Sequence, residues 1–339
     1  MKYIIDLEKT MRSKGYSEKY ISRCTNYARG LYNNKLPIIF DVKHLAKLMG
    51  IDPSIVNYYV FKSESLYTSY KISKKTGGYR TIDSPSLNLK KIQRWILDNV
   101  LLNFSISDHC YGFKQFVGIL DNASIHVNKK LVYNIDLEDF FPSITSTRVF
   151  FLFYNNGYSS EISYALTRLM TYKNRLPQGA PTSPMLSNII CINMDKELSS
   201  FAKKNQMMYS RYADDITFST NNIEDIKSLV DKIKKIIAFN EFEINLKKER
   251  FQFSNQPQYV TGLLVNNKVK IRRKFKKDVE KEIYFCEKYG ISNHLKYTRN
   301  FDKSFFKEYL YGKVYFIKSI EPDIGEEFMQ RLNDLNWSY

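Results

Sequence analysis

The sequence contains few cysteines and no long hydrophobic run. Its four cysteines lie far apart and form no C-x-x-C pair, which indicates reduced thiols in a cytoplasmic protein rather than disulfides or zinc ligands. No segment approaches the ~20 consecutive apolar residues of a membrane-spanning helix. Residues 1–8 place acids inside their apolar run and lack a small-residue cleavage site. We therefore expect neither membrane insertion nor a secretory signal.

Acidic residues are also scarce relative to basic ones. The 339 residues include 52 Lys and Arg against 35 Asp and Glu, a formal net charge of +17. Such an excess favours a polyanionic partner, and an anionic membrane surface is the competing interpretation. With 43% hydrophobic and 15% aromatic residues, the chain can bury a sizeable core in two or three subdomains.

Two adjacent aspartates, Asp214 and Asp215, lie between segments rich in β-branched and aromatic residues. This pattern predicts a β-hairpin with both carboxylates at its turn. A third carboxylate, Asp136, ends the alternating strand predicted for residues 131–137. A solvated turn is the alternative for an isolated aspartate pair. Three acids on adjacent strands would instead suit Mg²⁺, and two such ions would support an in-line phosphoryl displacement.

Local patterns predict the remaining elements. Helices are expected over residues 1–60, 87–102, 145–173 and 183–198, then over 222–239 and in three segments after residue 277. Residues 67–73 and 79–83 are expected to form a hairpin around a Gly-Gly tip, and residues 242–245 and 259–265 to form strands. Residues 110–130 look irregular, and residues 268–277 are the densest cationic segment.

Several of these segments resemble motifs of one family. Residues 212–215, Y-A-D-D, resemble the Y-x-D-D box of reverse transcriptases, and residues 136–141, D-L-E-D-F-F, resemble their upstream aspartate motif. Residues 176–184 resemble the L-P-Q-G-x-x-x-S-P box between those two. Residues 122–126, N-A-S-I-H, and 260–262, V-T-G, are similar to elements of the bacterial retron reverse transcriptases. The resemblance spans about residues 67–265.

The resemblance implies an α+β protein with the right-hand polymerase fold. Residues 1–60 would form an N-terminal helical region and residues 61–130 the fingers, built from helices and a hairpin. Residues 131–265 would form a palm with an antiparallel sheet, carrying a fingers insertion at about residues 145–184. Residues 266–339 would form a basic helical thumb.

The resemblance also implies an RNA-directed DNA polymerase that uses two Mg²⁺ ions. Asp136, Asp214 and Asp215 would be catalytic, and they would bind metal together with the carbonyl of Leu137. The candidate nucleotide contacts are Lys74, Arg80, Phe140, Phe141 and Gln178. The candidate RNA or DNA contacts are Asn122, His126, Val260, Thr261, Gly262, Arg272, Arg273 and Lys274.

Each of these assignments has a plainer alternative. Lys74 and Arg80 could bind phosphates from the hairpin tip or belong to a solvated basic turn. By resemblance, Phe141 would lie beneath the incoming sugar, where its ring would collide with a ribose 2′-hydroxyl; alternatively it could pack in the core like its neighbour Phe140. His126 has no metal partner at useful spacing, so we interpret it as structural or RNA-contacting. Lys247 and Lys248 could lie near the leaving pyrophosphate or form a solvated charge run.

The resemblance further implies the partners. A cognate structured non-coding RNA would serve as template and primer, and the product would be single-stranded DNA linked to an RNA 2′-hydroxyl. An effector protein encoded nearby would act with the enzyme in defence against phage, in the bacterial cytoplasm. Higher-order assembly of the enzyme is compatible with this resemblance. Two alternatives stand beside this one. A group II intron-type reverse transcriptase would add a maturase region or a Cys- and His-rich endonuclease, and a non-catalytic RNA-binding scaffold would not need the three aspartates.

Overall fold

The computed structural model describes residues 2–73, 77–298 and 305–337, and its first part is helical. The opening helices are α1 (Lys2–Ser13), α2 (Glu18–Asn33), α3 (Val42–Met49) and α4 (Pro53–Phe61). Ser17, Asp41 and Asp52 cap α2, α3 and α4 by accepting a hydrogen bond from a backbone N–H of the first turn. The helical character expected for residues 1–60 is confirmed.

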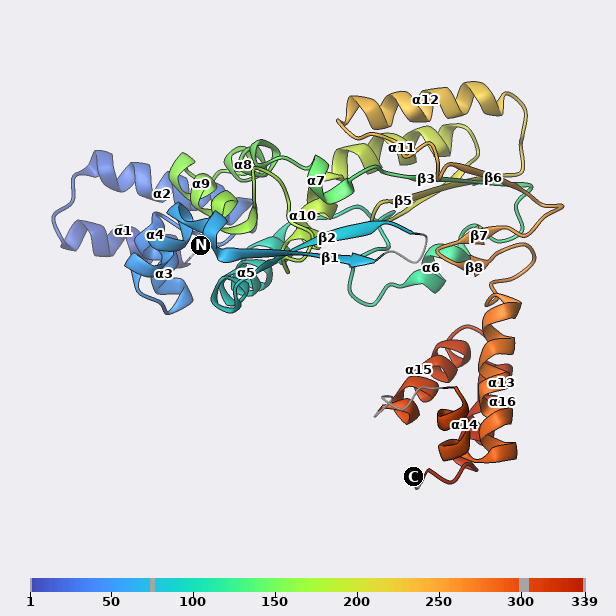
Figure 1. Ribbon diagram of the computed structural model, residues 1–339. Coiled ribbons are helices and arrows are strands. Elements are labelled where there is room, and N and C mark those ends of the chain that lie inside the picture. Colours follow the sequence, from blue (N-terminus) through green and yellow to red (C-terminus); the bar gives the residue numbers. More distant parts are fainter. Residues whose placement is uncertain (1, 74–76, 299–304, 338–339) are drawn as a thin grey trace.

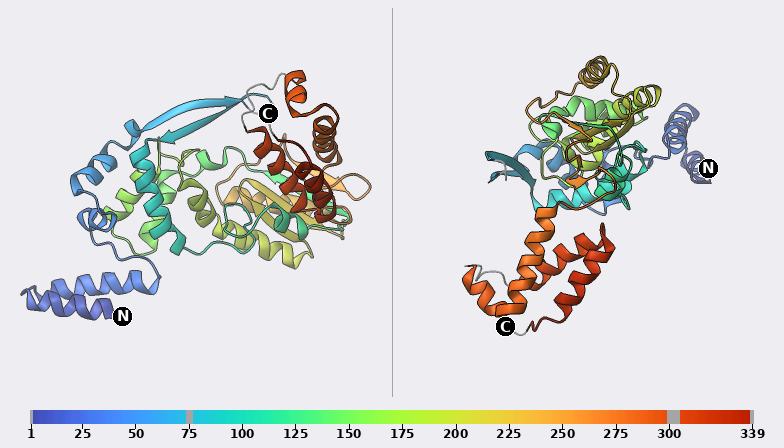
Figure 2. Two further views of the ribbon diagram at one scale, coloured as in Figure 1. Left: turned by 90° about the horizontal axis from the view of Figure 1, so that it is seen from below. Right: turned by 90° about the vertical axis from the view of Figure 1, so that its right-hand side faces the viewer.

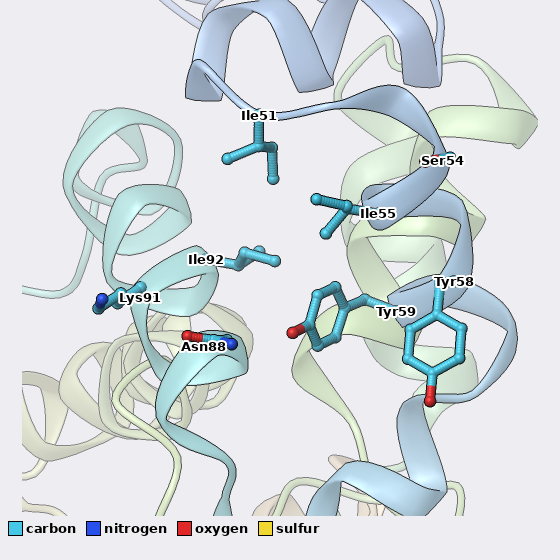
Figure 3. Close-up of a pocket in the computed structure, with 8 residues that line it drawn as sticks. All are labelled: Ile51, Ser54, Ile55, Tyr58, Tyr59, Asn88, Lys91 and Ile92. Atoms are coloured by element: carbon cyan, nitrogen blue, oxygen red, sulfur yellow. The ribbon is translucent and has the colours of Figure 1, made fainter.

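A long antiparallel hairpin follows, made of β1 (Tyr67–Ser73) and β2 (Tyr79–Pro85), as the sequence predicted. Lys74, a predicted nucleotide contact, lies outside the described residues. Short 3-10 turns at Ser63–Leu66 and Leu101–Asn103 flank the hairpin and helix α5 (Leu87–Asn99). An apolar pocket of about 560 Å³ between α4 and α5 is lined by Ile51, Ile55, Tyr59 and Ile92 among others (Figure 3). Among the described residues that line this pocket, none carries a carboxylate.

The central sheet is antiparallel, with the strand order β4-β5-β3-β6. Its strands are β3 (Leu131–Asp136), β4 (Met208–Tyr212), β5 (Asp215–Thr220) and β6 (Arg250–Phe253). The prediction of a strand at residues 242–245 is wrong. Ile244 makes only an isolated bridge to Leu137, because β3 ends at Asp136 and offers too few residues to extend the pairing. β6 takes the edge position.

Five helices lie between β3 and β4 in the sequence, and a sixth, α12, follows β5. They are α7 (Phe140–Ser143), α8 (Ser146–Asn155), α9 (Ser160–Met170), α10 (Ser183–Ile190), α11 (Ile192–Lys204) and α12 (Ile226–Phe239). Figure 1 shows α11 and α12 lying together over one face of the sheet. Helix α12 begins later than expected, and Ile223, expected to face inward, is exposed.

Two predictions near the V-T-G element need correction. Residues 259–265 form a tight hairpin of β7 (Tyr259–Val260) and β8 (Leu263–Leu264) rather than one strand, because Thr261 and Gly262 both take left-handed φ angles. The segment expected to be irregular contains helix α6 (Ile119–Ser124), which packs against β8 and β4. The N-A-x-x-H element is therefore partly helical.

The chain ends in a separate helical group. Its helices are α13 (Arg273–Tyr289), α14 (Ile291–Tyr297), α15 (Phe306–Lys318) and α16 (Pro322–Asn333). They share a core with β7, β8, α6 and Val132 of β3, and this core is distinct from the large core formed by the rest of the sheet and the earlier helices. Figure 2 shows this group projecting away from the sheet. Among the described helices, none combines the length and apolarity needed to cross a bilayer.

Candidate active site

The three aspartates singled out from the sequence meet at one end of the central sheet. Asp136 ends β3 and pairs in register with Asp215, the first residue of β5. The N–H of Leu137 donates to the Asp214 carbonyl at 3.0 Å, which ties the β4–β5 turn to the end of β3. The strand pairing thus brings together carboxylates that lie far apart in the sequence.

The three carboxylates face two hollows. Asp136 and Asp214, with Leu137, line a cleft of about 920 Å³. Asp215 lines a separate pocket of about 210 Å³, beside Arg250 and Thr261. Asp136 is buried and Asp214 half-buried, whereas Asp215 keeps an exposed edge. The cleft is therefore the place where a substrate could reach two of the three acids.

Burial and mutual repulsion together set the electrostatics of this cluster. The pKa of Asp214 is raised by burial and by the charge of Asp136. Burial and the charges of Asp214 and Asp136 raise the pKa of Asp215 to about 6, while water at its exposed edge screens part of that repulsion. The Lys248 ammonium lies 2.7 and 2.9 Å from the two carboxylate oxygens of Asp136 and offsets only part of the negative charge.

Crowded carboxylates of one sign are a donor set that suits a divalent cation. In the part of the chain that the structure describes, no three His, Cys, Asp or Glu side chains are grouped closely enough to hold a metal ion alone. The Asp136 carboxylate is paired with Lys248 instead. The aspartates therefore fit a metal ion whose remaining ligands come from the backbone, water and substrate phosphates.

The predicted nucleotide contacts that the structure describes line the same cleft. They are Arg80, Phe140, Phe141 and Gln178. Phe141 is half-buried, with its ring centroid 6.1 Å from that of Phe113. Phe140 is only 4% exposed and packs against Phe242, which favours its core-packing alternative.

The loop that carries Gln178 is held closely against the β1–β2 hairpin. The N–H of Asp83 donates to the Gln178 carbonyl at 2.9 Å. Gly179 has a φ of +138°, and a Cβ at this position would lie 2.8 Å from the Asp83 carbonyl oxygen. Only glycine allows this approach. The hairpin and the loop therefore form one continuous wall of the cleft.

Sequence reasoning missed three cations of the cleft wall. Lys90 and Arg94 on α5, together with Arg175, line the cleft that holds Asp136. Lys90 and Arg94 are four residues apart and so share one helix face, which was an available signal. The prediction for this helix considered only its apolar face. Of the Lys247 and Lys248 pair, Lys248 is the one that lines the cleft.

The candidate RNA contacts of the N-A-x-x-H element are buried. His126 Nδ1 lies 2.7 Å from Ser219 Oγ and its Nε2 lies 2.8 Å from Ser210 Oγ, so the ring joins β5 to β4. Burial lowers the pKa of His126 to about 3, which keeps the ring neutral. Asn122, also buried, contacts the Thr261 hydroxyl. These contacts favour the structural interpretation.

The remaining candidate contacts lie at the root of the C-terminal helices. Thr261 and Gly262 line the small pocket with Asp215, whereas Val260 is buried in the core. The Arg272 guanidinium stacks over the Tyr259 ring at 4.3 Å. Arg272, Arg273 and Lys274 are all exposed at the start of α13. This position leaves the three cations accessible to a polyanion.

The raised pKa of Asp215 makes stability depend on pH. An acid whose pKa rises on folding stabilises the fold while protonated, and this contribution is lost as the pH rises from about 4 through about 6. Without divalent ions, we therefore expect Asp215→Asn to unfold at a higher temperature than the wild type at pH 7. The difference should shrink towards pH 4. Thermal unfolding by circular dichroism measures it, and Asp231→Asn on α12 is the matched control. A pH-independent difference would contradict the prediction.

Comparison with known proteins agrees with this geometry. Residues 72–276 match the family described as reverse transcriptase (RNA-dependent DNA polymerase), whose members use divalent metal ions. The chain is 34% identical over 301 residues to the retron Ec86 reverse transcriptase of Escherichia coli, covering 87% of this chain and 94% of that protein. It is 32% identical over 336 residues to the retron Mx162 reverse transcriptase of Myxococcus xanthus, covering 89% and 68%. The chain therefore belongs to the reverse transcriptases and is an RNA-directed DNA polymerase of the retron type.

Proposed function

We propose that this enzyme copies a cognate structured non-coding RNA into single-stranded DNA that stays linked to the RNA, with Asp136, Asp214 and Asp215 as its catalytic acids. The observation that carries the proposal is the meeting of the three carboxylates at the sheet end, where Asp136 and Asp214 line one cleft with Arg80 and Gln178. A site with these groups suits nucleotidyl transfer at a nucleic-acid end.

The right-hand arrangement is part of the proposal. The β1–β2 hairpin and α5 would act as fingers, the central sheet as the palm, and the helices from α13 onward as the thumb. The boundaries are those expected from the sequence, at about residues 60, 130 and 265, with residues 145–184 as a fingers insertion. The core of the C-terminal helices is distinct from the main core and includes β7, β8 and α6, which supports a thumb that is anchored on these elements.

Two Mg²⁺ ions, when bound, would lower the pKa of the attacking hydroxyl and neutralise charge on the leaving pyrophosphate. Asp136, Asp214 and Asp215 would hold them, with the carbonyl of Leu137. Lys248 would exchange its contact with Asp136 for the triphosphate, since its side chain is 59% exposed and reaches the same cleft. An ammonium in this position can donate a proton or a hydrogen bond to the leaving group.

The cleft wall would select and hold the incoming nucleotide. Arg80 offers a planar fork of donors for phosphate oxygens, and Lys90 and Arg94 add positive charge to the same wall. Gln178 would contact the nucleotide from its constrained loop. The Phe141 ring would exclude a ribose 2′-hydroxyl. Lys74 stays a candidate by its place in the sequence alone.

Arg272, Arg273 and Lys274 would bind the phosphate backbone of the RNA or the new DNA. Their exposure at the start of α13 supports this role, as does the net charge of +17. Lys276 differs from them because it pairs with Glu321 at 2.7 Å. Val260, Thr261 and Gly262 would act through the shape of the β7–β8 hairpin. Asn122 and His126 would support that hairpin and the sheet from within.

The proposal extends to the biological setting. The named relatives are retron reverse transcriptases of bacteria, which supports a cognate RNA partner and priming from an RNA 2′-hydroxyl. We place the enzyme in the bacterial cytoplasm. There it would act against phage together with an effector protein encoded nearby.

Nucleic acid that co-purifies with the full chain tests the proposal. We expect bacteria that express the chain with its flanking non-coding DNA to yield RNA and DNA joined by a 2′–5′ linkage. Sequencing both strands, with and without debranching, would detect the junction. Unbranched complementary DNA would favour the group II intron-type alternative, and bound RNA without any DNA would favour the non-catalytic scaffold.

A further inference from the structure

Arg211 lies on β4, three residues before Asp214, and its charged side chain is fully buried. Its guanidinium forms a two-pronged pair with Asp195 of α11, with Nε 2.8 Å from Oδ1 and Nη2 2.7 Å from Oδ2. The remaining terminal nitrogen, Nη1, donates to Asn188 Oδ1 at 3.2 Å and to the Ala213 carbonyl at 3.1 Å. One side chain thus links two helices to the turn that carries Asp214.

The partners of Arg211 are themselves held by further contacts. Asp195 Oδ1 also accepts the Tyr209 hydroxyl at 2.6 Å. The Asn188 amide nitrogen donates to the Gly112 carbonyl at 2.9 Å, and its oxygen accepts from the Cys110 thiol at 3.0 Å. These contacts leave the network little freedom to rearrange because its members are buried and hydrogen-bonded.

The loop before α6 supports the same turn through its backbone. The N–H of Arg211 donates to the His109 carbonyl at 2.9 Å, and the N–H of Tyr111 donates to the Arg211 carbonyl at 2.8 Å. A Cβ on Gly112 would lie 2.5 Å from the Ala213 nitrogen, so the loop lies directly against the turn. The loop therefore packs directly on the backbone of Arg211 and Ala213.

Ala213 has a φ of +58°, in the left-handed region that non-glycine residues seldom adopt. Its carbonyl belongs to the peptide plane that leads into Asp214, so the direction of this carbonyl sets where the Asp214 side chain begins. We propose that Arg211 is a positioning residue for DNA synthesis, which binds the Ala213 carbonyl, holds this strained turn and so directs the Asp214 carboxylate into the cleft. The inference rests on the proposed catalytic role of Asp214.

A purely structural ion pair is the competing explanation. Breaking such a pair would lower stability, and activity would fall only as far as the folded fraction falls. A positioning role predicts a different pattern, because the effect on activity passes through the conformation of Ala213. Glycine adopts a left-handed φ without strain. Ala213→Gly should therefore relieve the loss caused by a change at Arg211.

The test uses Arg211→Lys in the full chain. Lysine keeps a positive charge beside Asp195, but a single ammonium cannot replace a fork that also reaches the Ala213 carbonyl. We expect kcat for deoxynucleotide incorporation to fall by about 10- to 100-fold, with the KM for the template–primer unchanged. Mn²⁺ binding to the free enzyme, followed by electron paramagnetic resonance, should weaken severalfold. Adding Ala213→Gly should recover activity by at least about threefold.

Tyr209→Phe is the matched control, because it removes one hydrogen bond from Asp195 and leaves the Arg211 contact with Ala213 intact. We expect it to lower the unfolding temperature without changing kcat. Three results would each overturn the inference. The first is a wild-type kcat in Arg211→Lys, and the second is a loss of kcat that Ala213→Gly does not rescue. The third is an equal loss of kcat in Arg211→Lys and Tyr209→Phe.

A second variant covers the case in which Arg211→Lys does not fold. Arg211→Met combined with Asp195→Leu removes both buried charges together, and the same rescue by Ala213→Gly is expected in that background. The role of Arg211 can be tested separately from the catalytic role of Asp214. Full activity in Asp214→Asn would refute the proposed site itself. Inactive Asp214→Asn beside fully active Arg211→Lys would refute only the role of Arg211.

Discussion

Asp214→Asn is expected to lower deoxynucleotide incorporation on an RNA template by at least ~10³-fold. The carboxylate lies in the cleft beside Asp136, and its pKa is raised first by burial and then by the charge of Asp136. An amide of the same shape keeps the turn but cannot neutralise a divalent cation. Single-turnover incorporation of one deoxynucleotide into a primed RNA template, at saturating Mg²⁺, is the measurement.

The matched control for this loss is Asp231→Asn, which changes the same functional group on the exposed surface of α12. It should incorporate nucleotides at the wild-type rate. Binding of the template–primer, measured by fluorescence anisotropy, should be unchanged or tighter in Asp214→Asn, because one negative charge has been removed near phosphates. Substantial synthesis by Asp214→Asn would show that the catalytic acids lie elsewhere.

Phe141→Ala is expected to let the enzyme accept ribonucleotides. The half-buried ring lies in the cleft between Phe113 and Phe140, where it would meet the sugar of an incoming nucleotide. Removing it takes away a steric clash with the 2′-hydroxyl, so the ratio of kcat/KM for deoxynucleotides over ribonucleotides should fall about 10- to 200-fold. Paired incorporation assays with each nucleotide and its ribose counterpart measure that ratio.

Phe140→Leu is the control for this change. Phe140 is buried against Phe242, so its substitution should lower stability through lost packing while leaving the preference for deoxynucleotides intact. Loss of sugar discrimination in both variants would mean that general loosening of the short helix α7 is responsible. Unchanged discrimination in Phe141→Ala would return Phe141 to the role of a packing residue.

Local signals in the sequence predicted most elements correctly. Helical spacing of apolar residues marked the N-terminal helices, alternation marked β3, and segments rich in β-branched and aromatic residues marked the strands on either side of Asp214. The errors fell where the pattern is short. Residues 242–245 alternate like a strand, but their partner at the end of β3 is a single residue, Leu137. The turn at Thr261 was missed because a left-handed threonine leaves no signal in sequence.

The sequence by itself determined which chemistry this protein carries, because each box of the family is a continuous segment with its own residue order. Only the tertiary structure decided how those boxes meet: the register that sets Asp136 against Asp215, and the Lys248 contact with Asp136 across 112 residues. It also placed Lys90 and Arg94 on the cleft wall and the buried Arg211 behind the Asp214 turn. Such contacts join residues far apart in the chain. Local periodicity cannot predict them, because it indicates which face of a helix or strand is apolar but not which other element packs against that face.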